Sequence, residues 1–449
     1  MCSSDLRANA PEGVLVHSTP KKLSQLRLGQ LSSVPVVGFF RKDGELTCDG
    51  VALSEIARAV GTPVYVYSAA LIEENFRRFD AALAPVSHLV CYAAKANSNL
   101  TVLSRLADLG AGADVVSGGE LRAVLECGFP ADRVVFSGVG KTLAEIGAGI
   151  DAGVLAFNAE SEREIEKIDA EAARRGKKAR VALRVNPDID AGSHPYISTG
   201  RKHNKFGIDI AKARNLFQRA GRFPNTTFVG VQAHIGSQIL DPEPLAQSAR
   251  ELAALATSLA NEGHPIETVD VGGGIGIGGS GETLTPERYA AAVLPHLTGL
   301  PFRILIEPGR AIVGPAGVLL TEVLYLKESS GKLFVVTDAG MNDLLRPALY
   351  GAIHTIEPVT DFRSGAPTVT ADVVGPICES SDFFLRDAEI PRPEEGDLLA
   401  IRDVGAYGFA MASNYNFRGR PAEVWVEDGD FRVVRRRETF EDLLRAERE

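Results

Sequence analysis

The sequence predicts an α/β protein, made of a (β/α)8 barrel of the TIM type and a second, β-rich domain that is a sandwich or a small barrel. Between Val64 and Arg310, short apolar runs rich in β-branched residues alternate with amphipathic stretches, which is typical of a parallel sheet with helical crossovers. After about Ala311 this alternation stops, and strand-like runs separated by Gly, Pro and Asp follow.

The barrel prediction depends on the number and spacing of the apolar runs. An open, doubly wound sheet has the same periodicity, but eight strand–helix units favour a closed barrel. Helix-like segments lie between the strands, for example Thr101–Leu109, Gly119–Cys127, Ser161–Arg175 and Pro244–Asn261. The predicted strands are His88–Lys95, Ala113–Ser117, Arg133–Gly138, Val154–Asn158, Ala179–Asn186, Phe228–His234, Thr268–Gly272 and Arg303–Glu307.

The β-rich domain is predicted in two parts. A turn at Lys42–Gly44 indicates a hairpin over Val36–Thr47, which we expect to join the later strands. Those later strands are Lys332–Thr337, Thr368–Val374, Leu398–Asp403, Ala422–Val426 and Phe431–Arg435. We therefore expect a tail (1–30), a first part of the β domain (31–61), the barrel (62–311) and a C-terminal β domain (312–449).

Composition and charge exclude several classes of protein. The 58 acidic residues outnumber the 48 Lys and Arg, and the formal net charge of −10 argues against nucleic-acid binding, which needs a basic face. The sequence has no long uncharged apolar run and no signal-like amino terminus, so we expect neither a membrane span nor secretion. Five scattered cysteines suit neither a disulfide framework nor a metal site, and we expect a cytoplasmic protein without a bound metal.

Residues that can take part in catalysis or ligand binding stand where the predicted barrel strands end. Lys95 and His234 each close an apolar strand, the glycine run Gly272–Gly276 ends another, and Glu307–Arg310 ends the eighth. The carboxyl ends of barrel strands and the loops that follow them converge on one face. We therefore expect these groups to share one site.

Lysine and the glycine run together suggest a cofactor. Taken alone, Lys95 is explained by an amine that reaches solvent or pairs with a carboxylate, but a partly desolvated amine loses proton affinity and can form a Schiff base with an aldehyde. The glycine run alone is equally explained by a tight turn, but its bare N–H groups also suit a phosphate dianion. Together, a reactive lysine and a phosphate-binding loop suggest pyridoxal 5′-phosphate.

Two further side chains fit the same cofactor. His234 is either a core histidine or a ring that stacks on the flat face of the pyridine, and Ser237 is placed to donate to phosphate. Glu307 either pairs with Arg310 or faces the pyridine nitrogen. In the second case it keeps that nitrogen protonated, which makes the ring the electron sink that decarboxylation requires.

These segments, together with Asp114–Glu120 and in this order, resemble the barrel of the alanine-racemase-like (fold type III) pyridoxal-phosphate decarboxylases. Narrower motifs resemble the diaminopimelate decarboxylase family within that class. The resemblance covers about residues 35 to 440. The narrower motifs are His194–Gly200, Asn204–Gly207, Gly340–Tyr350, Gly375–Ser380 and Gly405–Tyr407.

The resemblance implies roles for individual residues. Catalytic roles fall to Lys95 as the Schiff-base lysine, His234 as the stacking ring and Cys378 as the acid that protonates carbon. Cofactor binding falls to Lys95, His234, Ser237, Gly272, Gly273, Gly274, Gly276, Glu307, Gly309, Arg310 and Tyr407. Substrate binding falls to Arg310, Arg346, Tyr350, Glu379 and Tyr407. In the family Cys378 and Glu379 reach the active site of a neighbouring subunit, which implies a homodimer with shared sites.

The resemblance also implies a reaction, the decarboxylation of meso-2,6-diaminopimelate to L-lysine and carbon dioxide as the last step of lysine biosynthesis. Paired arginines suit the carboxylate that this substrate retains. A decarboxylase of ornithine, arginine or carboxynorspermidine, an amino-acid racemase and a pyridoxal-phosphate carrier remain alternatives. The polar segment Asp188–Lys205 is interpreted as a lid or an ordinary inserted loop.

Overall fold

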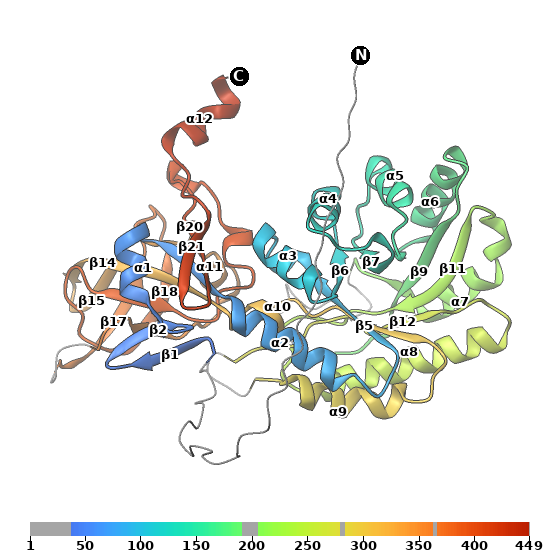
Figure 1. The fold of residues 1–449 in the computed structure, drawn as a ribbon, viewed down its shortest axis with the longest axis horizontal. Coiled ribbons are helices and arrows are strands. Elements are labelled where there is room, and N and C mark those ends of the chain that lie inside the picture. The colour runs from blue at the N-terminus through green and yellow to red at the C-terminus, as the bar shows by residue number, and fades with distance from the viewer. Residues whose placement is uncertain (1–36, 191–204, 279–282, 362–365, 449) are drawn as a thin grey trace, which may run out of the picture. The chain divides into compact units, whose positions relative to one another are not determined.

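The computed structural model describes residues 37–190, 205–278, 283–361 and 366–448 (Figure 1). Residues 36–449 form one compact unit. The predicted tail (1–30) and most of the Asp188–Lys205 segment lie outside the described residues, and so does the motif His194–Gly200. Within the described part of the chain, no helix is both long and apolar enough to cross a membrane.

Eight parallel strands close into a barrel, which confirms the predicted fold class. Neighbouring strands pair in sequence order, and the ring closes where β13 pairs with β5 and β8 pairs with β9. A two-residue strand, β10 (Ile208–Asp209), adds to β9. The barrel strands are β5 (His88–Ala93), β6 (Gly112–Val115), β7 (Val134–Phe136), β8 (Ala156–Ala159), β9 (Ala179–Asn186), β11 (Thr226–Gln232), β12 (Thr268–Asp270) and β13 (Arg303–Ile306).

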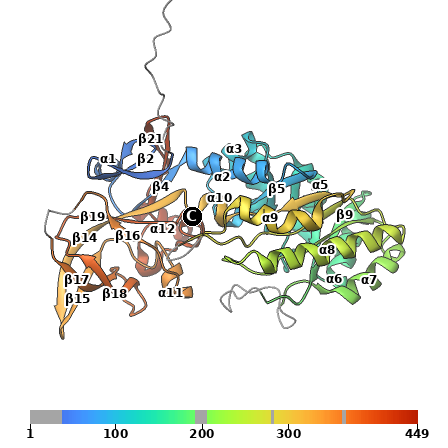
Figure 2. The ribbon, with the colours of Figure 1, turned by 90° about the horizontal axis from the view of Figure 1, so that it is seen from below.

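Helices cover the outside of the barrel (Figures 1 and 2). Side-chain caps start several of them: Ser117 caps α4, Ser161 caps α6, and Thr142 forms a capping box with Glu145 at α5. Their apolar faces pack on the strands, as the small and aliphatic buried residues of α8 show. These helices are α2 (Ala69–Ala82), α3 (Leu100–Asp108), α4 (Gly118–Glu126), α5 (Leu143–Ala152), α6 (Glu162–Arg174), α7 (Ile210–Gln218), α8 (Glu243–Asn261) and α9 (Pro286–Leu297).

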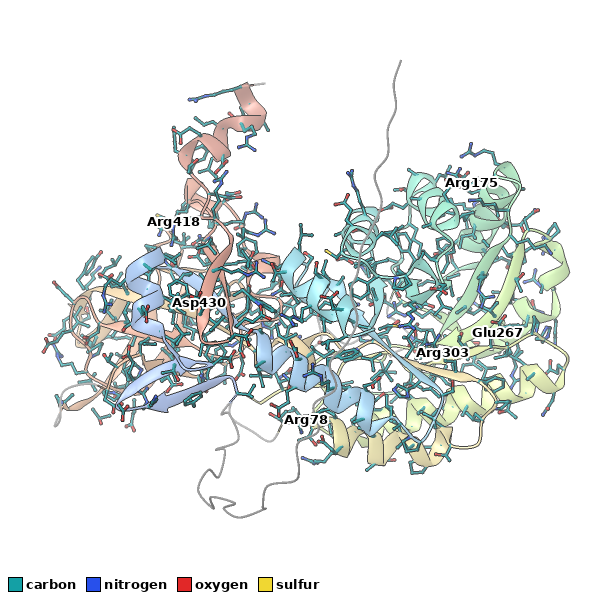
Figure 3. The ribbon with its side chains drawn as sticks, viewed as in Figure 1. Arg78, Arg175, Glu267, Arg303, Arg418 and Asp430 are labelled. Carbon is teal, nitrogen blue, oxygen red and sulfur yellow. The ribbon has the colours of Figure 1, made fainter. Side chains whose placement is uncertain are left out.

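The amino ends of the barrel strands carry ordinary structural polar contacts. Arg180 at the start of β9 forms an ion pair with Glu267 at 2.8 Å, and the Arg303 N–H donates to the Glu267 carbonyl at 2.9 Å (Figure 3). Residues at this end of a barrel of this type serve stability, whereas those at the carboxyl ends serve chemistry. A catalytic site is therefore expected at the carboxyl ends of the strands.

The second part of the protein is a nine-stranded sheet. Its long strand β14 (Gly317–Ser329) pairs antiparallel with β15, β19 and β4. Strand β4 (Val64–Ser68), which our predicted barrel range 62–311 contains, lies in this sheet, where it also pairs with β20. All five residues of β4 are buried, so the sequence alone does not show which sheet it joins. The other strands are β15 (Lys332–Thr337), β16 (Ile356–Pro358), β17 (Thr368–Val374), β18 (Phe383–Pro391), β19 (Leu398–Ile401), β20 (Ala422–Glu427) and β21 (Asp430–Arg435).

The early hairpin forms a small sheet of β1 (Phe39–Lys42), β2 (Glu45–Cys48) and β3 (Val51–Ala52), followed by α1 (Leu53–Val60). It lies against the β-rich part of the chain. The Leu46 N–H donates to the Val359 carbonyl at 2.7 Å, and buried apolar residues of the hairpin, α1, β4 and β14 form one cluster. The β-rich part is thus assembled from segments on both sides of the barrel sequence.

Candidate active site

A cavity of about 220 Å³ opens at the carboxyl ends of the barrel strands. It brings together most of the predicted site residues and includes three from beyond the barrel, Arg346, Tyr350 and Tyr407. A neighbouring hollow of about 430 Å³ shares its wall at Lys95, His234 and Glu307. The predicted residues that line the first cavity are Lys95, His234, Ser237, Gly274, Glu307, Gly309, Arg310, Arg346, Tyr350 and Tyr407.

Lys95 lies in a single turn, Ala94–Ala96, that follows β5. Its Nζ donates to Oδ2 of the fully buried Asp114 at 2.5 Å. Burial is the largest single effect and lowers the pKa of the Lys95 ammonium, but the interactions with Asp114, Tyr407 and Glu307 together outweigh burial, and the net pKa lies above its usual value. The expectation that this amine has lost proton affinity is therefore wrong for the chain without cofactor. Asp114 holds a charged amine at a fixed place on the cavity wall.

Glu307 directly follows β13 and is 4% exposed. Gln232 Nε2 lies 3.2 Å from both of its carboxyl oxygens, and Asn158 Nδ2 lies 3.3 Å from Oε1. Burial, followed by the negative charges of Asp114 and Asp270, raises the pKa of Glu307 well above its usual value. A carboxyl with this environment binds well to a group that brings a positive charge or a proton.

His234 follows β11 and is held by the glycine loop. The Gly273 N–H donates to His234 Nδ1 at 3.2 Å, so the ring proton lies on Nε2 in the neutral form. Burial, and then the positive charges of Arg184 and Lys95, lower the pKa of His234 well below its usual value. His234 is therefore a neutral aromatic ring on the cavity wall at physiological pH.

The glycine loop after β12 is packed against its neighbours so closely that no side chain fits. A Cβ atom on Gly272, Gly273 or Gly274 would lie 2.3, 2.1 or 2.2 Å from the carbonyl oxygens of Ala233, Glu307 and Gly236. Gly272 and Gly274 also have positive φ angles of 70° and 92°. Of the predicted loop glycines, only Gly274 lines the cavity. The other amides donate within the protein: Gly272 to Asp270, Gly273 to His234 and Gly276 to Ile239.

Replacing Gly274 with alanine is expected to weaken cofactor binding at least about tenfold, because the new methyl must displace the Gly236 carbonyl and adopt a strained φ. Titration of the cofactor-free variant with pyridoxal phosphate measures this change. Gly221→Ala serves as the control, since a Cβ there meets nothing within 4 Å. If Gly274→Ala and Gly221→Ala bound pyridoxal phosphate equally well, Gly274 would not be part of the cofactor site.

Two buried arginines face the cavity without a carboxylate partner among the described residues. Arg310 begins α10 (Arg310–Val313) and donates to Ser237 Oγ at 2.9 Å, while Arg346 begins α11 (Arg346–Tyr350). Each is 7% exposed, and the Nε of each has no hydrogen-bond partner in the described residues. Burial and the nearby Arg310 lower the pKa of Arg346 to about 10. Two buried cations of this kind are stabilised by an anion in the cavity.

Tyr407 connects the β-rich part to the barrel. Its ring lies 4.8 Å from the Arg310 guanidinium and 6.0 Å from that of Arg346, and its N–H donates to the Ala96 carbonyl at 2.8 Å. Tyr350 lies 5.7 Å from the Arg346 guanidinium. The β-rich part therefore completes the wall that the barrel alone leaves open.

Cys378 and Glu379 are exposed and do not line this cavity. The Cys378 N–H donates to Asn416 Oδ1 at 2.9 Å, and Glu379 Oε1 accepts from Ser381 Oγ at 2.8 Å. Hydrogen bonds from Ser381 and Tyr415 lower the pKa of Glu379. Within one chain, the structure does not bring these two residues to the other predicted site residues.

Polar residues inside the barrel strands were missed as site residues by sequence reasoning. Four of them surround Lys95 and Glu307, and each is at most 1% exposed: Asp114, Asn158, Gln232 and Asp270. The signal was present, because each is a polar residue in or at the end of an otherwise apolar strand, where an unpaired polar group is costly. Only spatial proximity shows that they form one cluster.

The donor set fits pyridoxal phosphate. Lys95 offers an amine for the aldehyde, the two arginines with Ser237 offer charge for anionic groups, and Glu307 offers a carboxyl for a basic ring nitrogen. Within the described residues the buried Nε atoms of Arg310 and Arg346 have no hydrogen-bond partner, and an anionic group of the cofactor or the substrate fits these donors.

Fold and site together define a pyridoxal-phosphate-dependent decarboxylase with a barrel and a β-rich domain. Residues 69–314 match the family model described as "Pyridoxal-dependent decarboxylase, pyridoxal binding domain". Diaminopimelate decarboxylase of Pseudomonas fluorescens is 50% identical over 91% of this chain and 98% of its own length. The enzyme of Aquifex aeolicus is 45% identical over 90% and 96%.

Solved structures agree with the sequence relatives. A crystal structure of diaminopimelate decarboxylase from Helicobacter pylori, complexed with L-lysine, matches with a TM-score of 0.85 and 46% identity. It covers 88% of this chain and 99% of that chain. This chain belongs to the diaminopimelate decarboxylase family of pyridoxal-dependent decarboxylases.

Proposed function

We propose that the chain converts meso-2,6-diaminopimelate to L-lysine and carbon dioxide with bound pyridoxal phosphate, as the last step of lysine biosynthesis. The observation that carries this proposal is the pair of buried arginines, Arg310 and Arg346, on the cavity that also contains Lys95. A substrate that keeps one carboxylate after losing the other suits two guanidinium groups. Dibasic substrates such as ornithine and arginine have no carboxylate at their far end.

The residues divide the work of the reaction. Bound pyridoxal phosphate supplies an electron sink for the pair released when carbon dioxide leaves. Asp114 orients Lys95, which holds the cofactor covalently, and His234 presents a neutral ring for stacking. Glu307 keeps the proton at the ring nitrogen.

The remaining roles concern anionic groups. Ser237, Gly274 and Tyr407 hold the phosphate, while Arg310, Arg346 and Tyr350 orient the far carboxylate of the substrate. Gly309 lets α10 begin close to the strand end, since a Cβ there would lie 2.9 Å from the Ala96 Cβ. Gly272, Gly273 and Gly276 shape the loop rather than contact the phosphate, because their amides donate within the protein.

The active unit that we propose is a homodimer. Cys378 and Glu379 are exposed and lie off the cavity of their own chain, as expected if they complete the cavity of a second copy. There Cys378 delivers the proton to carbon and Glu379 binds the far amino group. We place the enzyme in the cytoplasm, since the cysteines in the described residues are free thiols, as in a reducing compartment.

Incubation of the purified holoenzyme with meso-diaminopimelate, L-ornithine and L-arginine tests the reaction. We expect carbon dioxide and L-lysine from the first substrate and no product from the other two. Preferred release of putrescine or agmatine would replace the proposal with a dibasic amino-acid decarboxylase. Exchange of the α-hydrogen without carbon dioxide would indicate a racemase, and a coloured but inert protein would indicate a carrier.

Replacing Cys378 with alanine is expected to slow lysine formation about 10²- to 10⁴-fold, the usual contribution of a positioned general acid, without loss of cofactor colour. Cys127, a half-buried thiol that directly follows α4, provides the matched control as Cys127→Ala. Steady-state kinetics and the absorbance spectrum measure the two effects. An unchanged rate in Cys378→Ala would show that Cys378 is not the acid that protonates carbon.

Mixing two inactive variants tests whether sites are shared between subunits. Dissociation and reassociation of Cys378→Ala with Lys95→Ala gives hybrid dimers in which one site has both residues intact. We expect activity to reappear in the mixture, up to about one quarter of the wild-type value if pairing is random. A mixture as inactive as its parents would show that each site is built from one chain.

A further inference from the structure

A second buried carboxyl lies beside Glu307 in the barrel interior. Asp270 ends β12, the strand that pairs with β13, and it is 1% exposed. Its Oδ1 accepts the Gly272 N–H at 2.9 Å, which fixes the first turn of the glycine loop. Its Oδ2 is buried and has no donor among the described residues. A buried carboxylate oxygen without a donor is costly unless a proton lies between it and a neighbour.

Glu307 is the neighbour that can supply this proton. Asp270 and Glu307 stand at the carboxyl ends of two paired strands, and both are buried, so one proton shared by the pair would satisfy Oδ2 of Asp270. Burial raises the pKa of both groups, and the charges of Asp114 and Asp270 raise that of Glu307 further. Glu307 therefore carries the shared proton and Asp270 accepts it. The reaction as proposed above uses Glu307 but gives Asp270 no role.

We propose that Asp270 is a positioning residue for the cofactor: its buried carboxylate keeps a proton on Glu307, and this proton passes to the pyridine nitrogen when the cofactor binds. The inference rests on the proposed place of Glu307 at that nitrogen. The proton leaves the Glu307 carboxyl and forms the N–H bond of the ring, Glu307 becomes a carboxylate, and no proton is taken from solvent. The charge of Asp270 behind Glu307 then opposes loss of the ring proton.

Other charged groups around the pair are unchanged by a substitution at Asp270. Lys95 and Asp114 face Glu307 from the ends of β5 and β6, and their charges act in opposite directions on it. Cys91 on β5 is fully buried, and the negative charges of Asp270 and Glu307 help to raise its pKa, so its thiol stays neutral. Asn158 and Gln232 contribute only neutral donors to Glu307. Asp270 is thus the group whose removal changes the charge next to Glu307 while leaving its direct donors in place.

The test follows the ring nitrogen itself. Holoenzyme loaded with pyridoxal phosphate labelled with ¹⁵N in the ring is titrated between about pH 6 and pH 10, and the ¹⁵N chemical shift reports whether the nitrogen is protonated. Asp270→Asn keeps the shape and the Oδ1 acceptor for Gly272 but removes the charge. We expect the nitrogen of the wild type to stay protonated across this range. In the variant its pKa should fall by about one unit or more, a tenfold loss of proton affinity.

Controls separate charge from packing. Asp343→Asn removes another buried aspartate, 1% exposed, whose pKa burial raises to about 7, and it should leave the ¹⁵N titration unchanged. Asp270→Ser should repeat the shift if Asp270→Asn binds too little cofactor to measure. If the ring nitrogen of both Asp270 variants titrated as in the wild type, the inference would be overturned. Asp270 would then only stabilise the turn of the glycine loop. If Glu307→Gln also titrates as the wild type, the assignment of Glu307 fails instead.

Discussion

Replacement of Lys95 with alanine is expected to abolish the visible absorbance of bound pyridoxal phosphate and to lower kcat at least about 10³-fold. The reason is that Nζ of Lys95 is the amine on the cavity wall that Asp114 orients at 2.5 Å. Loss of a nucleophile that acts together with its partners typically removes several orders of magnitude in rate. Absorbance spectra and initial rates with meso-diaminopimelate measure both effects.

A matched lysine distinguishes this effect from a general loss of charge. Lys177 is half exposed and forms an ion pair with Asp151 at 3.2 Å, away from the cavity. Lys177→Ala should retain colour and rate, because an exposed ion pair contributes at most about 1 kcal/mol to stability. Turnover that survives in Lys95→Ala at more than a few per cent would remove Lys95 from the site.

Replacement of Arg346 with methionine is expected to lower kcat/KM for meso-diaminopimelate by about 10²-fold, chiefly through KM, with normal cofactor colour. Hydrogen bonds to charged groups contribute about 1.5–3 kcal/mol, and the guanidinium is placed to bind the substrate carboxylate. Arg346 shares the cavity with Arg310, and burial together with that charge lowers its pKa to about 10. The variant should therefore unfold at a urea concentration no lower than that of the wild type, since a strained cation is removed.

Arg386 supplies the control for this substitution. It is exposed and lies over the Phe383 ring, with its guanidinium carbon 3.8 Å from the ring centroid, outside the cavity. Arg386→Met should leave kcat/KM unchanged. A wild-type KM in Arg346→Met, or a loss of cofactor colour, would show that Arg346 serves the cofactor or the fold rather than the substrate.

Much of the fold could be predicted because its periodicity is local. The eight barrel strands were found from their apolar runs, and their ends placed Lys95, His234 and Glu307 on one face. The strand β4 could not be assigned, since it is buried on both faces in whichever sheet it joins. The long β14 was missed because its first five residues are all buried and its second half is mostly exposed, so it lacks the alternation typical of a strand.

The site was predicted less completely than the fold. The predicted direction of the pKa shift of Lys95 was wrong. The sequence does not show that Asp114, on the next strand, lies within hydrogen-bond distance of the Lys95 amine. Burial alone would have lowered this pKa, but the interactions with Asp114, Tyr407 and Glu307 together outweigh it. The amides of Gly272 and Gly273 donate to other groups of the protein, and this too depends on distances that the sequence does not show. Interactions between strand ends are set by register and closure, which periodicity does not specify.

The proposed function depends on Lys95 as the amine to which pyridoxal phosphate is attached. Reduction of the holoenzyme with sodium borohydride fixes the cofactor on its lysine, and peptide mass spectrometry then locates the added phosphopyridoxyl group. We expect the group on the peptide that contains Lys95, in a yield that matches the loss of visible absorbance. The same modification on Lys141, Lys205 or another lysine, with Lys95 unmodified, would show that Lys95 does not carry the cofactor.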